Sequence, residues 1–153
     1  MFIKALKVEF LDDVKFKLYF QDGKIFEYDL VRVFDKYPQL KDLRTDRNLF
    51  INGHLDPGGY GVIWNDRLDF SAMSVYVYGK FIGTFPISIN QKVAMAIMEA
   101  REAKNLTQVE LSKLSGIDQG DISKIEQGLG NPTIKKLQKI ANGLNMELNI
   151  FFK

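Results

Sequence analysis

Apolar and polar residues alternate along the first thirty positions of the chain, and the apolar spacing becomes helical after residue 90. Three alternating runs come first, separated by Asp12-Asp13 and by Asp22-Gly23. Successive side chains of a strand point to opposite faces, so the pattern predicts an antiparallel meander of three strands with one buried face. Asp22-Gly23 predicts a two-residue hairpin turn. The apolar positions are Leu6, Val8 and Phe10, then Phe16, Leu18 and Phe20, then Phe26, Tyr28 and Leu30.

The pattern between residues 31 and 79 is less regular. Residues 31–43 are predicted to form a short helix interrupted at Pro38, and residues 48–64 to add one or two strands around a glycine-rich turn. The element that begins at residues 69–71 and ends near Gly79 fits either a helix or a strand. The prediction is an α+β domain over residues 1–80, followed by an apolar linker over residues 81–89 that packs between two domains.

Residues 90–145 are predicted to form an all-α domain. A first helix covers residues 93–104, and Thr107 with Glu110 forms a capping box that starts the second. Gly116 ends that helix, because glycine tolerates positive φ, and Asp118 is a good N-cap for the third. After Pro132 and Thr133, a final helix carries one apolar stripe, formed by Ile134, Leu137, Ile140, Ala141 and Leu144.

The third predicted helix has two distinct faces. At about 100° per residue, Ile122 and Ile125 fall together on its inner side. The opposite side carries Gln119, Gly120, Ser123, Lys124 and Gln127. A short helix with an apolar back and a polar front is typical of one that enters the major groove of DNA.

The segment from residue 90 to 146 resembles the Cro/C1-type, or Xre, family of helix-turn-helix domains. The family consensus runs roughly TQ-x-x-LA-x-x-x-GIS-x-x-x-IS-x-x-E-x-G-x-x-x-P-x-x-x-x-L-x-x-IA-x-x-L. The resemblance implies a lambda-repressor-like all-α fold. The matching residues are Thr107, Gln108, Leu111, Gly116, Ile117, Ile122, Ser123, Glu126, Gly128, Pro132, Leu137, Ile140, Ala141 and Leu144.

The same resemblance implies roles for single residues. Residues 118–127 would be the recognition helix, with Gln119 and Lys124 at positions that usually meet base edges. Gln108 matches a position that usually contacts a phosphate, and Arg101 with Glu126 matches a buried ion pair. The candidate DNA-binding residues are Gln108, Asp118, Gln119, Gly120, Asp121, Ser123, Lys124 and Gln127.

Two positions depart from the family pattern. Gly120 leaves one readout position without a side chain and loosens the start of the helix. Asp121 brings a negative charge near the groove, where phosphate repels it unless it accepts a hydrogen bond from a cytosine amino group.

The N-terminal part has a resemblance of its own. LYFQDGKIFEYDL and the later GVIWNDRLDF are similar to a small bacterial domain family of unassigned function, over about residues 8–78. Members of that family occur next to, or fused with, helix-turn-helix domains and beside genes for toxins. The resemblance implies an α+β fold and an antitoxin-like regulator, and it supplies no catalytic residues.

Composition and charge limit the functions that remain. The chain has 153 residues and no cysteine, which excludes disulfides and thiolate metal sites and fits a reducing cytoplasm. We expect no signal peptide and no membrane span. Residues 1–89 carry 12 basic and 12 acidic side chains and residues 90–153 carry 9 and 7, so the net charge of +2 lies in the second part. Because this excess is small for a nucleic-acid binder, we expect a homodimer on a palindromic double-stranded operator.

The sequence argues against an enzyme. His54 is the single histidine, so neither a His-based metal cluster nor a Ser-His-Asp triad has more than one histidine candidate. The glycines at 58, 59 and 61 lack the GK[ST] sequence of a phosphate-binding loop. Asp66 and Asp69 are interpreted as a turn residue and a helix-start charge. We therefore expect no catalytic residues, cofactor or metal.

Two functions fit these observations. The first is a sequence-specific DNA-binding repressor, including the antitoxin of an autoregulated operon. The second is a protein-interaction module that keeps the helical fold without binding DNA. The N-terminal domain would bind a partner such as a toxin, supply a dimer interface or sense a small ligand. Residues 146–153 alternate apolar and polar side chains and are predicted to form a strand that needs a partner.

Overall fold

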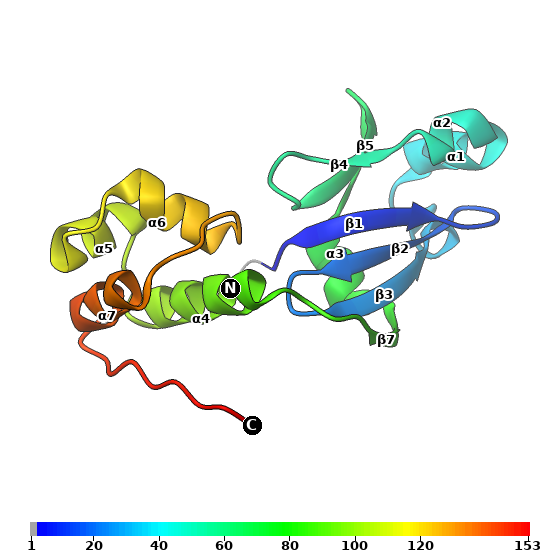
Figure 1. The fold of residues 1–153 in the computed structure, drawn as a ribbon. Coiled ribbons are helices and arrows are strands. Elements are labelled where there is room, and N and C mark those ends of the chain that lie inside the picture. The colour runs from blue at the N-terminus through cyan, green and yellow to red at the C-terminus, as the bar shows by residue number, and fades with distance from the viewer. Residues whose placement is uncertain (1–2) are drawn as a thin grey trace. The chain divides into compact units, whose positions relative to one another are not determined.

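The computed structural model describes residues 3–153 and divides them into two compact units, one ending at Pro86 and one beginning at Ile87. Figure 1 gives the order of helices and strands along the chain. Each unit has a buried apolar core of its own. The predicted class, an α+β part followed by a helical part, is confirmed.

The main sheet of the first unit has the strand order β1-β2-β3-β7. Strands β1 (Ala5–Phe10), β2 (Lys15–Phe20) and β3 (Lys24–Asp29) form the predicted antiparallel meander. The alternation in β2 places Phe16, Leu18 and Phe20 in the core, where each is 0% exposed. Burying three large apolar side chains on one face fixes the register, because a slip by one residue would expose all of them.

The turn between β2 and β3 is one residue longer than predicted. It has three residues, ending at Gly23, whose backbone N–H donates to the Phe20 carbonyl at 2.9 Å. Gly23 has φ +84°, the left-handed conformation that closes a three-residue hairpin loop. Asp22-Gly23 therefore marks the turn correctly, but one further residue joins the loop.

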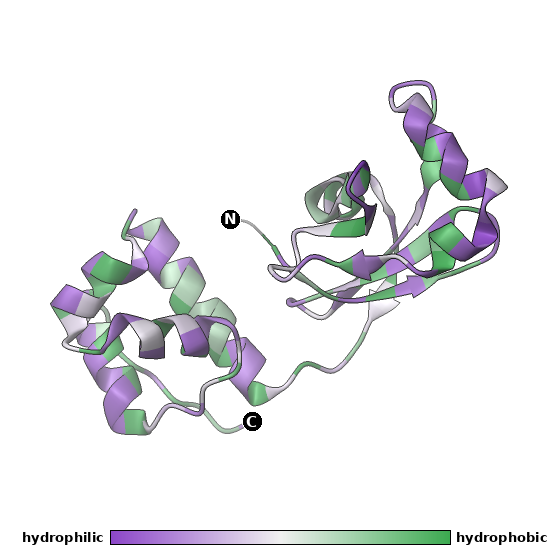
Figure 2. Ribbon diagram, turned by 90° about the horizontal axis from the view of Figure 1, so that it is seen from above, coloured by the Kyte–Doolittle hydropathy of each residue, from purple (hydrophilic) through white to green (hydrophobic). Residues whose placement is uncertain are grey.

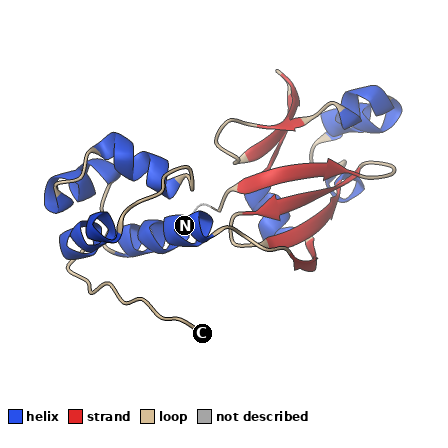
Figure 3. Ribbon diagram, in the orientation of Figure 1, coloured by secondary structure: helices blue, strands red, loops and turns tan. Residues whose placement is uncertain are grey.

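A second antiparallel sheet contains β4 (His54–Leu55), β5 (Gly61–Asn65) and β6 (Leu68–Ser71). Short helices occupy the rest of the unit, as Figure 3 shows: η1 (Leu30–Val33), η2 (Pro38–Lys41), α1 (Asp42–Thr45), α2 (Arg47–Ile51) and α3 (Ala72–Tyr78). Pro38 begins η2, which explains the predicted interruption. Residues 72–78 are helical because Ser71 caps the helix, its hydroxyl accepting from the Ser74 backbone N–H at 3.4 Å.

Aromatic rings fill the core of this unit. Phe50 and Trp64 stack with centroids 6.2 Å apart, and Phe10 meets Phe50 edge to face at 4.9 Å. The Trp64 indole N–H donates to the Phe50 carbonyl at 2.8 Å, so its polar atom is satisfied inside the core. These rings join the meander, the second sheet and α2 into one core.

The second unit contains four helices: α4 (Ile89–Ala103), α5 (Gln108–Ser115), α6 (Gln119–Glu126) and α7 (Ile134–Gly143). Polar and apolar residues share each helix, as the colours of Figure 2 show. The buried core residues are Ile97, Leu111, Ile117, Ile122, Ile125, Ile140 and Leu144.

Two apolar side chains of these helices, one leucine of α5 and one isoleucine of α7, lie outside that core. Leu114 is 59% exposed and Ile134 is 66% exposed. Leu114 lies about 60° around the helix from Leu111, because three residues turn about 300°. Only Leu111 stands at the centre of the packed face of α5. Ile134 is the first residue of α7 and lies at its exposed start.

Two predictions about the connecting segments are wrong. Residues predicted as linker, 81–89, begin inside strand β7 (Lys80–Thr84), which pairs with β3, and end at the start of α4. Phe81 contacts Phe26 with ring centroids 5.6 Å apart, so its apolar side chain completes the sheet. Residues 146–153 form no strand, because residues 87–153 contain no other strand to which they could add.

Within residues 3–153, no helix has the length and apolar character needed to span a membrane.

The end of α7 packs against the end of α5 at Gly143. A Cβ at position 143 would lie 2.9 Å from the backbone nitrogen of Ser115 and 3.0 Å from its Cα. We expect Gly143→Ala to lower the free energy of unfolding by about 1–3 kcal/mol, because the two helices must separate. Urea denaturation measures the change. Lys139→Ala, at an exposed position of the same helix, is the matched control and should be near neutral. Equal stability of the two variants would contradict this account of the contact.

Candidate nucleic-acid interface

The interface begins with the capping box of α5. The Thr107 hydroxyl accepts from the Glu110 backbone N–H at 3.1 Å, and the Glu110 carboxylate accepts from the Thr107 backbone N–H at 2.7 Å. Both bonds satisfy N–H groups that the first turn of a helix otherwise leaves free. The bond from the Thr107 backbone is the main reason why the pKa of Glu110 is lowered. The predicted capping box is confirmed.

A tight turn then connects α5 to α6. Gly116 has φ +70° and ends α5 in the left-handed conformation, as predicted. Ile117 is 7% exposed, so its side chain anchors the turn in the core. The Asp118 carboxylate accepts from the Gly120 backbone N–H at 2.9 Å and caps α6. The turn thereby fixes the direction in which α6 leaves α5.

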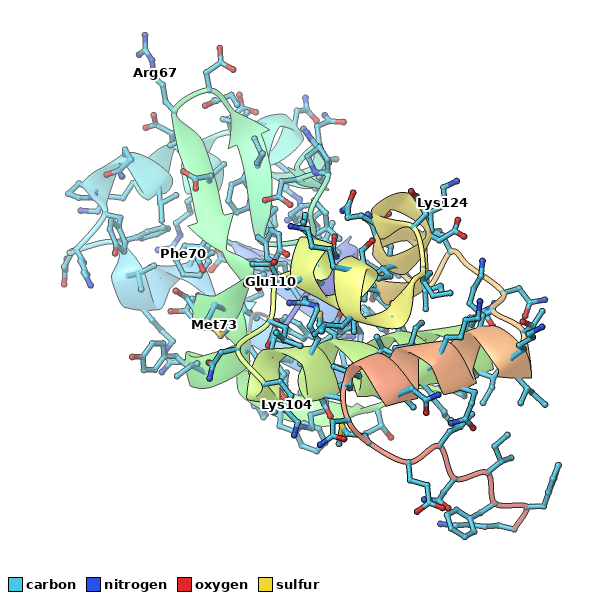
Figure 4. The ribbon with its side chains drawn as sticks, turned by 90° about the vertical axis from the view of Figure 1, so that its left-hand side faces the viewer. Arg67, Phe70, Met73, Lys104, Glu110 and Lys124 are labelled. Carbon is cyan, nitrogen blue, oxygen red and sulfur yellow. The ribbon has the colours of Figure 1, made fainter. Side chains whose placement is uncertain are left out.

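Helix α6 has the predicted inner and outer faces. Ile122 is 0% exposed and Ile125 is 4% exposed, so both isoleucines pack into the core. Gln119, Lys124 and Gln127 are exposed, and Gly120, Asp121 and Ser123 are half-buried. Figure 4 shows Lys124 projecting from α6. The helix therefore presents amide and ammonium groups to the outside, backed by an apolar contact.

Glu126 is the buried charged residue that holds this arrangement together. Its side chain is 4% exposed and pairs with Arg101 through two bonds, from Nε to Oε1 at 2.7 Å and from Nη2 to Oε2 at 2.9 Å. The bidentate pairing with Glu126 raises the pKa of Arg101. The remaining Nη1 group of Arg101 donates to the Leu106 carbonyl at 2.7 Å. The Arg101–Glu126 ion pair thus joins α4 to α6, and the bond from Arg101 to Leu106 adds the segment before α5.

The same carboxylate extends this network to two candidate DNA-binding residues. The Gln108 amide Nε2 donates to Glu126 Oε2 at 2.9 Å. The Gln108 amide oxygen accepts from Nε2 of Gln119 at 2.9 Å. Three side chains from α5 and α6 therefore form a continuous chain of hydrogen bonds that orients the Gln119 amide.

Asp121 has a partner that the sequence did not predict. Lys136 Nζ, from α7, lies 2.6 Å from Asp121 Oδ2, and this hydrogen bond is the main reason why the pKa of Asp121 is lowered. Only the tertiary structure brings the two residues together, because they are fifteen positions apart and lie on different helices. The negative charge of Asp121 is therefore balanced locally.

The end of α6 is shaped by two further contacts. The Gln127 amide donates to the Ser123 hydroxyl at 3.2 Å, one helical turn earlier. Gly128 has φ +74°, and a Cβ there would lie 2.5 Å from Oε1 of Gln91, which is 9% exposed. Sequence reasoning missed Gln91, since a lone glutamine in α4 carries no signal of burial.

The residues considered for catalysis, phosphate binding or metal binding do not come together in one site. His54 is exposed on β4, and Asn65 accepts from the backbone N–H groups of Arg67 and Leu68, so the Asn65-Asp66 segment forms the predicted turn. Gly59 has φ +73° and its carbonyl accepts from the Ala5 N–H at 2.8 Å, which is a structural role. Within residues 3–153, no three metal-ligating side chains lie together.

Two family models match the chain. The model described as helix-turn-helix matches residues 97–151, and the model described as a protein of unknown function (DUF2442) matches residues 5–81. The chain belongs to the DUF2442 family and carries a Cro/C1-type helix-turn-helix domain. Both resemblances inferred from the sequence are confirmed.

Individual relatives match a little over a third of the chain. An HTH-type transcriptional regulator of Sinorhizobium fredii, y4dL, is 36% identical over 58 residues, which are 38% of this chain and 30% of that protein. The ImmF control region 10 kDa protein of Bacillus phage phi105 is 35% identical over 60 residues, which are 39% of this chain and 67% of that protein. The chain thus spans less than a third of the length of y4dL and about two thirds of the phage protein.

A solved structure is also similar to part of the chain. It is the restriction-modification controller protein C.Esp1396I, a tetramer in complex with its natural 35 base-pair operator. The identity is 37%, the match covers 40% of this chain and 82% of that chain, and the TM-score is 0.39.

The capping box makes stability depend on pH. The pKa of Glu110 lies below its ordinary value of 4.5 in the folded state, so its contribution to stability is present above pH 4.5 and is lost as the pH falls through the lowered pKa. We expect Glu110→Gln to reduce the free energy of unfolding at neutral pH and to make it fall less steeply towards acid pH. Urea denaturation at several pH values measures both effects.

Glu99→Gln is the control for this experiment, because Glu99 is an exposed carboxylate of α4. An equal loss of stability for Glu110→Gln at neutral and acid pH would contradict the role of the ionised carboxylate in the cap.

Proposed function

We propose that this protein is a sequence-specific transcriptional repressor that binds a palindromic DNA operator as a homodimer, with α6 in the major groove. The observation that carries the proposal is the outward polar face of α6, whose Gln119 amide is oriented through Gln108 by the buried carboxylate of Glu126. Pre-oriented side chains on a short helix are the means by which helix-turn-helix proteins recognise base edges. The names of the two relatives, a transcriptional regulator and a control-region protein, agree with this role.

Three polar residues of the candidate interface receive a role in this proposal. Gln119 uses one N–H for Gln108, which leaves its amide oxygen and the second N–H for the edge of an adenine. Lys124 is exposed and offers its ammonium to a guanine. Gln108 lies at the first position of α5, where a phosphate is favoured by the free N–H groups of the helix start.

The balance of charge at Asp121 favours this function over a module that does not bind DNA. The alternative rested on Asp121, on Gly120 and on the small positive charge of the helical part. The ion pair with Lys136 places a positive charge beside Asp121 and offsets part of the repulsion that an unpaired carboxylate would exert on phosphate. Gly120 lies in an otherwise regular helical turn, where its lack of a side chain allows close approach of a base edge.

The small net positive charge of the chain is the argument for homodimerisation. A single copy carries a net charge of only +2, so few phosphates are neutralised and its DNA affinity is low. Two copies on a two-fold symmetric site double the contacts and match the symmetry of a palindrome. An antitoxin role would add a toxin as a protein partner and stays a prediction from the sequence.

The readout residues give the first test of this function. We expect Gln119→Ala and Lys124→Ala each to weaken binding to the operator by about 1–3 kcal/mol and to relax preference at one base pair. Lys104→Ala is the matched control, because Lys104 is an exposed lysine at the end of α4 that Figure 4 places away from Lys124. Fluorescence anisotropy with DNA from upstream of the gene measures the affinities.

The same titrations at several salt concentrations test the mode of binding. The logarithm of the affinity should fall linearly and steeply with the logarithm of salt concentration. An operator affinity that does not change with salt concentration would overturn the proposed interface. So would a Lys104→Ala variant whose operator affinity is as low as that of Lys124→Ala.

The tail gives a test of dimerisation. Residues 146–153 mix apolar and polar side chains, and among the apolar ones Phe151 is 81% and Phe152 98% exposed. Leu144 is the last buried residue before them. We propose that the apolar side chains of the tails of two copies pack against each other, because burying them removes apolar surface from water. Deleting residues 146–153 is expected to convert a dimer into a monomer and to weaken operator binding, while the midpoint of urea denaturation of the helical unit changes little. Light scattering measures the mass, and a truncated protein that stays dimeric would contradict the assignment.

A further inference from the structure

A pocket of about 310 Å³ opens in the first unit and takes no part in the DNA interface. Its walls come from β3, η1, η2 with the segment before it, β6 and α3. This volume lies at the lower end of the range for small-molecule sites. The floor is apolar and buried, formed by Tyr28, Leu40 and Phe70, which are 4%, 2% and 6% exposed. An apolar floor of this size suits the side chain of a small ligand.

Tyr28 adds one polar atom to this floor. Its ring packs on Phe70 with centroids 4.9 Å apart, and its hydroxyl has no hydrogen-bond partner among residues 3–153. Solvent reaches this hydroxyl in the pocket, so its hydrogen-bonding capacity is free for a ligand. Burial is the main reason why the pKa of Tyr28 is raised, so the hydroxyl stays protonated at neutral pH and can both donate and accept. The pocket therefore has an apolar floor with one hydrogen-bonding point.

The rim of the pocket carries both signs of charge. Lys36 precedes η2 and Asp69 belongs to β6, and both side chains are exposed at the pocket. Two more tyrosines line the pocket, Tyr37 and Tyr78, and the Lys36 ammonium lies 5.3 Å from the centre of the Tyr37 ring. A cation and an anion on separate elements suit a ligand whose head group carries both charges.

We propose that this pocket binds a free aromatic α-amino acid with a polar atom at the tip of its ring, the class to which tyrosine belongs. The carboxylate is held by Lys36 and the ammonium by Asp69. The ring lies against Leu40 and Phe70, and its polar tip bonds to the Tyr28 hydroxyl. The proposal does not depend on DNA binding by the helical unit.

The test uses L-tyrosine as the probe and the full-length protein labelled with ¹⁵N. We expect amide shifts in residues 33–40 and 69–78, and affinity about three- to tenfold higher for L-tyrosine than for L-phenylalanine, because one hydrogen bond separates them. Tyramine, which lacks the carboxylate, and N-acetyl-L-tyrosine, which lacks the ammonium, should both bind more weakly. N-acetyl-L-tyrosine binding at least as tightly as L-tyrosine would overturn the proposal in favour of a peptide C-terminus.

Single substitutions assign each contact. Tyr28→Phe should fold as well as the wild type, because its hydroxyl has no partner to lose, and should bind L-tyrosine and L-phenylalanine equally. Lys36→Met and Asp69→Asn should each weaken L-tyrosine binding about tenfold, by loss of a charged partner. Lys41→Met, an exposed lysine outside the pocket, is the matched control. Absence of shifts at millimolar L-tyrosine, or unchanged discrimination in Tyr28→Phe, would overturn the assignment.

Discussion

The helical unit depends on the ion pair between the buried carboxylate of Glu126 and Arg101. Within residues 3–153, Glu126 is the only charged side chain that is buried, and a buried charge is tolerated only when it is fully paired. Arg101 supplies two bonds and Gln108 a third, so the carboxylate joins α4, α5 and α6. Removing one partner of such a pair costs about 3–5 kcal/mol, because the other charge stays buried. The bonds that stabilise the unit are therefore the same bonds that orient its outward amides, and fold and proposed recognition rest on one group.

The two units position their candidate sites by different interactions. In the helical unit, capped helix ends and short turns fix α6 against a small apolar core, and function is proposed for the side that the core leaves exposed. In the first unit, aromatic rings from both sheets fill the core, and one of them, Tyr28, carries a hydroxyl to the edge of that core. The first site is a convex surface suited to a groove, whereas the second is a concavity suited to a small molecule. Sheet and short helices can hold such a concavity because their side chains converge from several elements.

Local patterns predicted most of the individual elements. The strands of the meander followed from alternation, the start of α5 from Thr107 and Glu110, and its end from Gly116, because each of these signals acts within a few residues of the chain. The predictions that were wrong concern pairing over longer distances. Strand β7 was interpreted as part of a linker, because its place at the edge of β3 depends on a segment more than fifty residues earlier. The tail has the alternation of a strand but no neighbouring strand within residues 87–153, and alternation alone does not make a strand.

The sequence by itself determined which residues of α6 face outwards, since helical periodicity assigns Gln119 and Lys124 to one side and two isoleucines to the other. It also determined the family of the helical part, because fourteen consensus positions stand at fixed spacing. Only the tertiary structure decided the partners of those side chains: Gln108 for Gln119, and Lys136 for Asp121. It alone revealed the pocket around Tyr28. Partners and pockets arise where elements distant in sequence meet, and the geometry of those meetings is set by packing of the whole core, which no local pattern contains.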